Sequence, residues 1–219
     1  MAPLHPSVRD ALAAALALAF PTWCAGCDDP DTALCADCRA ALAPPRLIPH
    51  RRLGGLDVHS ALEFDGVAAR VLRAFKEEGR TTLATALAPA LAAALGSCGE
   101  STAVVPVPST AAAVRRRGYR PVELLARRAG ARPWRLLRVV RASADQRGLT
   151  RAARAQNVAG SLEAAPAAAG RRVVLVDDVV TTGATLAEAA RALRAAGAQV
   201  VAAATVAATP RHGARLSGM

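Results

Sequence analysis

Aromatic side chains are scarce in this sequence: they make up 3% of its 219 residues, although 53% of the residues are hydrophobic. The core therefore has to be built mostly from alanine, leucine and valine, so its packing elements will be small. Lysine is nearly absent too, because Lys76 is the only one, and arginines supply most of the net charge of +11. This charge suits phosphate-rich ligands, nucleic acid or an anionic surface, and the arginine bias of a GC-rich genome explains it equally well.

Long apolar runs are missing as well. No segment approaches the ~20 uninterrupted apolar residues that a membrane-spanning helix needs. In the apolar stretch 8–20, the charges of Arg9 and Asp10 cancel, and no small-residue cleavage site follows before Pro21. We therefore predict a short amphipathic helix there rather than a signal peptide, and a cytoplasmic protein. A Walker-type phosphate loop is also absent, which argues against an ATP-driven motor.

Turn-forming and charged residues gather between Pro44 and Gly55, as expected of a linker. The chain is long for one minimal domain and short for two full ones. We therefore predict a small N-terminal module at residues 1–45 and one main domain at residues 46–219.

Strand and helix patterns alternate along the main domain. Strands are predicted at 56–64, 102–107, 173–176 and 199–206, and helices at 66–78, 82–95, 122–129 and 184–196. A loop is predicted around Arg115, Arg116 and Arg117, and a frayed tail from Ala203 to Met219. This alternation predicts an α/β fold with a mainly parallel twisted sheet and helices on both faces.

Four of the five cysteines form two Cys-x2-Cys pairs in the N-terminal module: Cys24, Cys27, Cys35 and Cys38. This spacing brings two thiolate pairs close enough to close one tetrahedral site, as in structural zinc modules. Such a metal supplies an apparent binding free energy of ~10–16 kcal/mol, enough to fold a piece with almost no core. An iron–sulfur cluster is the alternative, since it also takes four thiolates. Cys98 has no base partner nearby and the histidines show no ligand spacing, so they receive no role.

The segment 173–186, VVLVDDVVTTGATL, joins a buried strand to a helix through two aspartates and a Thr/Gly loop. Open parallel sheets bind ligands at the carboxyl ends of their strands, and the first turn of the following helix attracts anions. Gly183 lets the backbone approach a phosphate, and neighbouring threonines add hydroxyl donors. Asp177 and Asp178 would repel a phosphate but accept hydrogen bonds from sugar hydroxyls. The segment therefore predicts a ribose 5-phosphate site; an ordinary capped helix is the alternative, but a cap needs only one such residue.

This segment resembles the motif that binds phosphoribosyl pyrophosphate (PRPP) in type I phosphoribosyltransferases. Further motifs, in family order, resemble the ComF/GntX family of that superfamily: the four cysteines, Phe75-Lys76 with Gly79, Val105-Pro106-Val107-Pro108, Arg117-Gly118-Tyr119, and the run Gln146, Leu149, Arg154, Asn157, Val158 and Gly160. Together they cover nearly the whole chain. The sequence departs from the family at Arg120 and Pro121, where Asn and Gln are usual, and at Leu162, where Phe is common.

The resemblance implies roles for these residues. Asp177 and Asp178 would bind the ribose hydroxyls, and Mg²⁺ would bridge those hydroxyls and the pyrophosphate. The 5-phosphate would be held by Thr181, Thr182, Gly183, Ala184 and Thr185. The candidates for neutralising the leaving pyrophosphate are Lys76, Arg115, Arg116, Arg117 and Arg154, of which Arg117 and Arg154 match the family best. The alternatives are a solvated surface run for the three adjacent arginines and a helix-end lysine that meets the helix dipole.

Three functions remain open at this point. The first is an enzyme that transfers phosphoribose to an amine or a nucleobase and releases pyrophosphate. The second is a sensor that binds PRPP or a nucleotide without turnover. The third follows from the association of ComF-like proteins with DNA uptake and competence: a protein that binds single-stranded DNA or a competence protein, although few aromatic side chains are present for base stacking. The sequence names neither the acceptor nor the oligomeric state.

Overall fold

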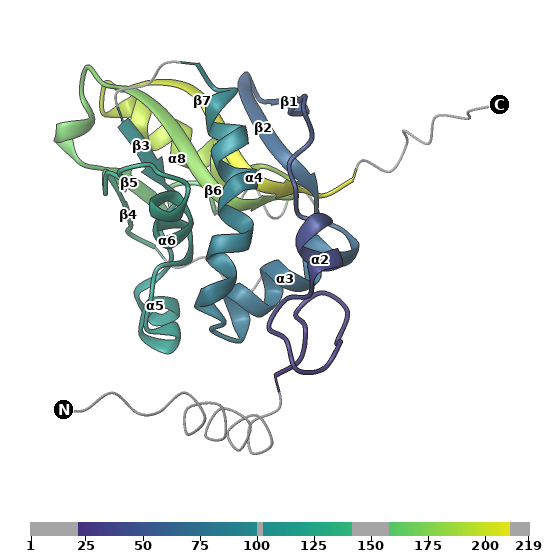
Figure 1. Cartoon of the computed structure of the whole chain (residues 1–219). Coiled ribbons are helices and arrows are strands. Elements are labelled where there is room, and N and C mark those ends of the chain that lie inside the picture. Colours follow the sequence, from purple (N-terminus) through teal and green to yellow (C-terminus); the bar gives the residue numbers. More distant parts are fainter. Residues whose placement is uncertain (1–21, 100–102, 142–157, 211–219) are drawn as a thin grey trace, which may run out of the picture.

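The computed structural model describes residues 22–99, 103–141 and 158–210, and its centre is a five-stranded sheet (Figure 1). The strands lie in the order β1-β2-β7-β6-β3. Their bounds are β1 His50–Leu53, β2 Leu56–Glu63, β3 Ala103–Pro106, β6 Arg172–Val180 and β7 Gln199–Ala208. The pairs β2–β7, β7–β6 and β6–β3 are parallel, whereas β1 runs antiparallel to β2. The predicted α/β fold with a mainly parallel sheet is confirmed.

Helices cover both faces of this sheet. On one face lie α3 (Gly66–Glu77), α4 (Ala84–Gly96) and α6 (Pro121–Arg128), and on the other lies α8 (Ala184–Ala195) (Figure 1). The smaller elements are α2 Ala36–Ala40, α5 Ala111–Arg117, the 3-10 turns η1 Thr81–Leu83 and η2 Pro166–Ala168, and the antiparallel ribbon of β4 Leu137–Val139 and β5 Leu162–Ala164. None of the helices in the described ranges combines the length and the apolar character needed to cross a bilayer.

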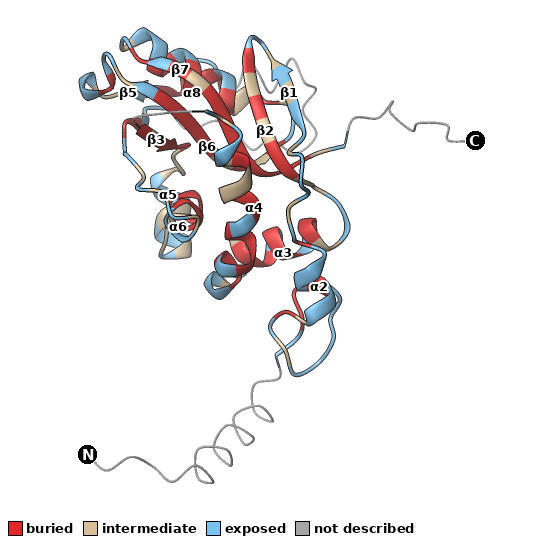
Figure 2. Cartoon of the chain, turned by 45° about the horizontal axis from the view of Figure 1, so that its top comes forward, coloured by how far each residue is buried: buried red, intermediate tan, exposed pale blue. Residues whose placement is uncertain are grey.

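Strand β6 divides the core into two layers, because successive side chains of a strand point to opposite faces. Val174 and Val176 pack in the layer that contains α3, α4 and α6, whereas Val173 and Leu175 pack in the layer that contains α8. Buried residues concentrate along the central strands and on the sheet-facing sides of the helices (Figure 2). Much of this core is alanine, as its composition predicts.

The predicted linker at 44–55 is wrong in its second half, which forms a hairpin. β1 pairs with β2 from His50↔His59 to Leu53↔Leu56. Gly54 and Gly55 close the turn with φ angles of 56° and 82°. Two successive positive φ angles favour glycine and match the twist of a tight hairpin. The charged residues of this segment favoured a linker in the prediction, but charged residues are also common on edge strands such as β1. The division near residue 45 stays a prediction.

Two other segments also differ from their predictions. The three adjacent arginines end helix α5 rather than forming a loop, because Thr110 Oγ1 accepts a hydrogen bond from the Ala113 N–H at 3.2 Å and Gly118 ends the helix with φ 77°. Residues 203–208 form the buried end of β7 rather than a frayed tail, because β7 lies between β2 and β6. The predicted helix at 8–20 and the residues after 210 lie outside the described ranges.

Candidate functional site

A cavity of about 580 Å³ opens at the carboxyl ends of β3 and β6, where an open parallel sheet is expected to bind its ligand. Its walls come from the end of α3, the segment after β3, α5, the start of α6, and the end of β6 with the loop that follows. Predicted site residues that line it are Lys76, Arg117, Asp177, Asp178, Thr181 and Thr185. Segments that are far apart in the sequence therefore meet at one place.

Lys76 and Asp178 form an ion pair in the wall of this cavity. Nζ of Lys76 lies 2.5 Å from Oδ2 of Asp178. Asp178 is 3% exposed, and its Oδ1 accepts a hydrogen bond from the Val179 N–H at 2.9 Å. Burial raises the pKa of this carboxyl, but the Lys76 ammonium and the hydrogen bonds that the carboxylate accepts together outweigh burial and hold the pKa of Asp178 below its ordinary value. Burial likewise disfavours the charged lysine, yet the two nearby carboxyls raise the pKa of Lys76.

Asp177, although adjacent, is in a different state. It is half-buried, and its Oδ1 accepts a hydrogen bond from the Asp178 N–H at 2.9 Å. Burial, together with the negative charge of Asp178, raises the pKa of Asp177 well above its ordinary value, and Lys76 opposes this shift only in part. The two acids are therefore not equivalent: Asp178 is paired with Lys76, whereas Asp177 retains a proton more readily. The sequence alone treats them as an equal pair.

The position of both acids follows from the length of β6. The strand continues past its predicted end at Val176 to Val180, and Asp177 pairs with Thr205 of β7. Asp178 continues the side-chain alternation of Val174 and Val176, and so faces the layer that contains α3. A paired backbone therefore holds both carboxyls, which fixes their positions more firmly than a loop would.

The Thr/Gly loop joins β6 to α8 and borders the same cavity. Thr181 and Thr185 line it, whereas Thr182 Oγ1 accepts a weak hydrogen bond from the Ala184 N–H at 3.4 Å. Gly183 precedes α8 with φ 81° and supplies no side-chain cap. A Cβ atom at this position would lie 2.6 Å from Cδ1 of Leu53, so the hairpin packs directly against the loop. Apart from the weak bond of the Ala184 N–H, the first turn of α8 has no side-chain cap among the described residues and meets the cavity at Thr185, which suits an anion.

The basic residues divide into two groups. Arg117 lines the cavity beside Lys76, but Arg115 and Arg116 are exposed and do not line it. Arg154 lies outside the described residues. Arg73 also lines the cavity, and the sequence reasoning missed it. The sequence could have indicated Arg73, because it lies three residues before Lys76 and this spacing places both side chains on one side of a helix.

Tyr119 links the segment Arg117-Gly118-Tyr119 to α3. Its hydroxyl donates a hydrogen bond to the carbonyl oxygen of Phe75, and the two rings lie with centroids 5.7 Å apart. Because Phe75 precedes Lys76, this contact holds the end of α3 against the turn that follows Arg117. The two cationic side chains are thereby kept on the same side of the cavity.

The phosphoribosyl transferase domain model matches residues 107–217, about half of the chain. This chain belongs to that family. The matched range contains Arg117, both aspartates and the Thr/Gly loop, and the sheet and helices described above are the type I phosphoribosyltransferase fold that the sequence predicts. Lys76, by contrast, comes from outside the matched range.

Curated relatives are similar over short segments. The adenine phosphoribosyltransferase of Mycobacterium avium (strain 104) is 65% identical over 37 residues, which are 17% of this chain and 21% of that protein. The orotate phosphoribosyltransferase of Nocardioides sp. (strain ATCC BAA-499 / JS614) is 63% identical over 35 residues, 16% of this chain and 20% of that protein. The chain thus spans about a fifth of the length of these relatives.

Two solved structures are also similar. The first is described as the allosteric regulatory enzyme of purine biosynthesis; it is 26% identical, with a TM-score of 0.36, over 58% of this chain and 25% of that chain. The second is glutamine PRPP amidotransferase from B. subtilis; it is 26% identical, with a TM-score of 0.35, over 58% of this chain and 26% of that chain.

The four cysteines of this phosphoribosyltransferase-family chain gather as the spacing predicts. Their sulfur atoms all lie within 4.8 Å of one another, and the sulfurs of Cys27 and Cys35 are 3.7 Å apart. Zn–S bonds of ~2.3 Å in a tetrahedron require sulfur separations of roughly 3.8 Å, so the set fits one zinc ion. An iron–sulfur cluster needs room for several irons and sulfides between the thiolates, which this spacing does not offer. Backbone N–H groups of Gly26 and Cys35 also point at the Cys24 sulfur, at 3.4 and 3.3 Å.

The cysteine module packs against α3. Cys24 and Cys38 share a hydrophobic cluster with Phe75. Arg80, just after α3, donates hydrogen bonds to the carbonyl oxygens of Trp23 at 2.7 Å and Ala33 at 2.9 Å. The helix that presents Lys76 to the cavity is therefore supported from its other side by the cysteine module.

Replacing Lys76 by methionine tests the ion pair. Because Asp178 would stay buried without its partner, we expect Lys76→Met to lower the free energy of unfolding at pH 7 by about 2 kcal/mol, less than for a fully buried pair because the lysine is partly exposed. The double variant Lys76→Met/Asp178→Asn should recover much of that loss. Urea unfolding measures both, with Arg128→Met as an exposed control. Equal stability of Lys76→Met and wild type would show that the pair does not form.

Metal analysis tests the cysteine site. We expect one zinc per chain in the wild type and none in Cys38→Ser, and we expect zinc removal to lower the free energy of unfolding, because the module packs on α3. Cys98→Ser is the control, since burial raises the pKa of that thiol to about 12 and it is not among the clustered four. Iron with visible absorption bands would assign an iron–sulfur cluster instead.

Proposed function

We propose that this chain is a PRPP-binding phosphoribosyltransferase of the ComF/GntX type, which transfers phosphoribose to a nitrogen acceptor and releases pyrophosphate. The observation that supports it most is the cavity in which a helix start suited to an anion, a half-buried carboxyl and three cationic side chains meet. The family binds PRPP, and the order of the cysteine module, Lys76 and Arg117-Gly118-Tyr119 supports the ComF/GntX assignment. The relatives named for adenine and orotate favour a ring nitrogen as the acceptor.

Each part of PRPP has a partner in this proposal. The 5-phosphate rests on the first turn of α8 and on the hydroxyls of Thr181 and Thr185. The ribose hydroxyls donate to Asp177, which lines the cavity and forms no ion pair of its own among the described residues. The diphosphate lies near Lys76 and Arg117. Asp178 acts through Lys76, which it holds in place.

The reaction needs little chemistry from the protein. The acceptor nitrogen forms a bond to C1 of the ribose, the bond from C1 to the diphosphate oxygen breaks, and the nitrogen loses one proton as pyrophosphate leaves. Positive charge builds on the sugar and negative charge on the leaving group. Cations positioned at the diphosphate, and carboxyls that hold the ribose, stabilise this charge distribution in the transition state more than they stabilise the ground state. Mg²⁺ that binds together with PRPP would add positive charge that neutralises the leaving diphosphate, and Asp177 is the cavity carboxyl that would help to hold it.

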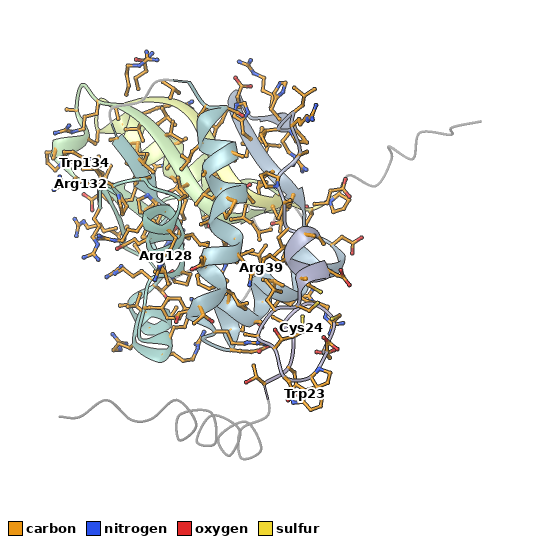
Figure 3. All side chains as sticks on the ribbon, in the orientation of Figure 1. Trp23, Cys24, Arg39, Arg128, Arg132 and Trp134 are labelled. Carbon is orange, nitrogen blue, oxygen red and sulfur yellow. The ribbon has the colours of Figure 1, made fainter. Side chains whose placement is uncertain are left out.

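Binding of single-stranded DNA is a second candidate, and one surface favours it. Trp134 is 37% exposed, with the Arg171 guanidinium 4.4 Å from its ring centroid. Arg132 lies beside it at the edge of the molecule away from the cysteine module (Figure 3). An indole flanked by arginines suits a stacked base and its phosphate. Such binding would weaken steeply with salt and would not respond to changes at Asp177.

Calorimetric titration with PRPP and Mg²⁺ tests the first proposal. We expect Asp177→Asn to weaken binding about 10- to 100-fold, because hydrogen bonds to a charged acceptor are lost. Since the raised pKa of Asp177 keeps it protonated at lower pH, wild-type affinity should rise with pH as this carboxyl ionises, and the variant should lose that part of the rise. Asp57→Asn, at a partly exposed site on the hairpin away from the cavity, is the control.

The outcomes separate the functions. PRPP binding followed by pyrophosphate release with an acceptor supports the enzyme, and PRPP binding without release for every acceptor supports a sensor. No PRPP binding by the wild type would exclude both. Tight, salt-sensitive DNA binding by Asp177→Asn would then favour the second candidate.

A further inference from the structure

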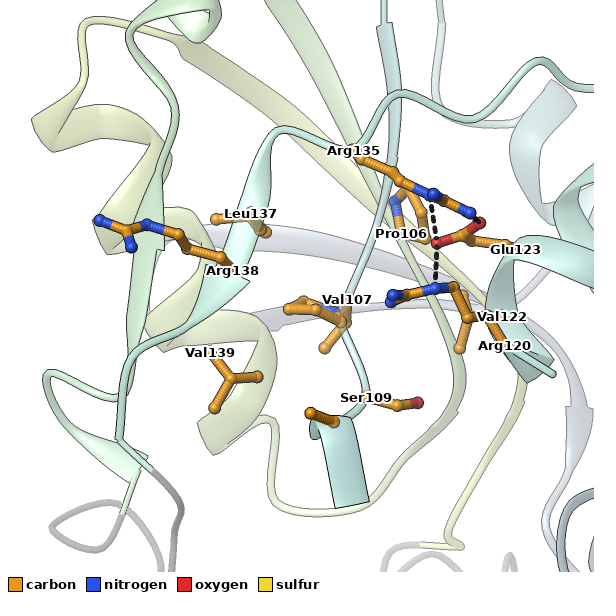
Figure 4. Close-up of a pocket in the computed structure, with 12 residues that line it drawn as sticks. Pro106, Val107, Ser109, Arg120, Val122, Glu123, Arg135, Leu137, Arg138 and Val139 are labelled. Atoms are coloured by element: carbon orange, nitrogen blue, oxygen red, sulfur yellow. Dashed lines mark hydrogen bonds and ion pairs between the residues drawn. The ribbon is translucent and has the colours of Figure 1, made fainter. Parts of the chain in front are cut away.

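A second cavity, of about 250 Å³, lies next to the first (Figure 4). The two share the wall formed by Val107, Pro108, Ser109 and Val122. The remaining walls of the smaller cavity come from the start of α6 and from β4 with the residues before it. A molecule bound here would therefore be the immediate neighbour of one bound in the sugar-phosphate cavity.

A buried carboxylate organises the polar side of this cavity. Glu123 is 9% exposed, and Arg135 donates three hydrogen bonds to it, at 2.7 to 3.0 Å. Nε of Arg120 lies 3.6 Å from Oε1 of the same carboxylate. Figure 4 shows both guanidinium groups directed at Glu123 from opposite sides. Two cations around one anion leave a net positive charge at the cavity.

Arg120 is the side chain that this network leaves available. In the described part of the chain, Glu123 is the sole ionic partner of the Arg120 guanidinium, and Arg120 lines the cavity. Arg138, in contrast, points away from the cavity in Figure 4 and pairs with Glu163 at 2.5 Å. Glu123 thus positions one guanidinium for a ligand, which reduces the entropy lost when that ligand binds.

The rest of the lining is largely apolar. It includes Val107, Val122, Leu137 and Val139, which offer a surface for a ring but no side-chain hydrogen bonds. A cavity of ~150 Å³ is large enough for benzene, so this one holds a single substituted six-membered ring but not a nucleotide. An arginine fork beside an apolar slot matches a planar carboxylate, which a guanidinium binds through two parallel hydrogen bonds.

We infer that this cavity binds the acceptor, and that the acceptor is a monocyclic aromatic acid with a ring or amino nitrogen, its carboxylate held by Arg120. This inference rests on the proposed transferase function. The nitrogen would form the bond to C1 at the border of the two cavities, the bond from C1 to the diphosphate oxygen would break, and the nitrogen would lose a proton, as in the reaction above. Arg120 would contribute to specificity, and Glu123 would be a positioning residue.

Paired probes test the carboxylate directly. Nicotinate and anthranilate are compared with nicotinamide and anthranilamide, which keep the ring and remove the charge. By calorimetry we expect at least one acid to bind about 10- to 100-fold more tightly than its amide, because a charged hydrogen-bond pair is lost in the amide. Arg120→Met should abolish this preference and Arg120→Lys should keep part of it. Arg128→Met, at the far end of α6 and outside this cavity, should leave it unchanged.

Further measurements separate this inference from the proposed function. Arg120→Met should bind PRPP as the wild type does, whereas Asp177→Asn should lose PRPP affinity and keep the preference for the acid. In the wild type, the acid that binds should release pyrophosphate from PRPP, and Arg120→Met should raise its KM. Equal binding of acids and amides, or an acid that binds without pyrophosphate release although PRPP binds, would overturn the inference. The inference would also be overturned if pyrophosphate, and none of the acids, bound in a way that depends on Arg120. That result would assign the cavity to the leaving group.

Discussion

The ion pair between Lys76 and Asp178 joins the two halves of the site. Asp178 is buried on the central strand, so it needs a cation, and the nearest one stands at the end of α3. An unpaired carboxylate at this depth would be costly, which ties the position of α3 to the sheet. The pair also makes the two aspartates differ in pKa. Lys76 helps to keep Asp178 ionised, whereas the pKa of Asp177 is raised, so Asp177 is the acid that takes up or gives up a proton.

Much of the remaining structure keeps this lysine in place. The cysteine module supports α3 from one side through Arg80 and the shared hydrophobic cluster, and Tyr119 holds its end from the other. The part of the chain that matches the phosphoribosyl transferase family begins at residue 107, so the cavity is completed by a helix that precedes it. In this view the cysteine module has a positional effect on the cavity although it does not line it.

The sequence predicts the parts of this molecule that depend on local pattern. Periodicity gives the α/β fold, the paired Cys-x2-Cys motifs give a four-sulfur cluster that fits zinc, and the strand–loop–helix segment gives the aspartates and threonines of the cavity. Contacts between distant segments are not predicted, because nothing in a local pattern says that Lys76 reaches Asp178 or that Leu53 covers Gly183. The same limit applies to Arg120. In the sequence it is notable only as a departure from a family motif, and its contact with Glu123 is seen only in the fold.

Lys76 is the only lysine of the chain, so isotope-labelled lysine gives one side-chain signal in an NMR spectrum. Titration of that signal tests the central pair most directly. The account predicts a pKa above the ordinary value of ~10.4, a fall of that pKa in Asp178→Asn, and a shift of the signal when PRPP and Mg²⁺ are added. A signal with the pKa of a free lysine, unmoved by Asp178→Asn and by PRPP, would contradict it.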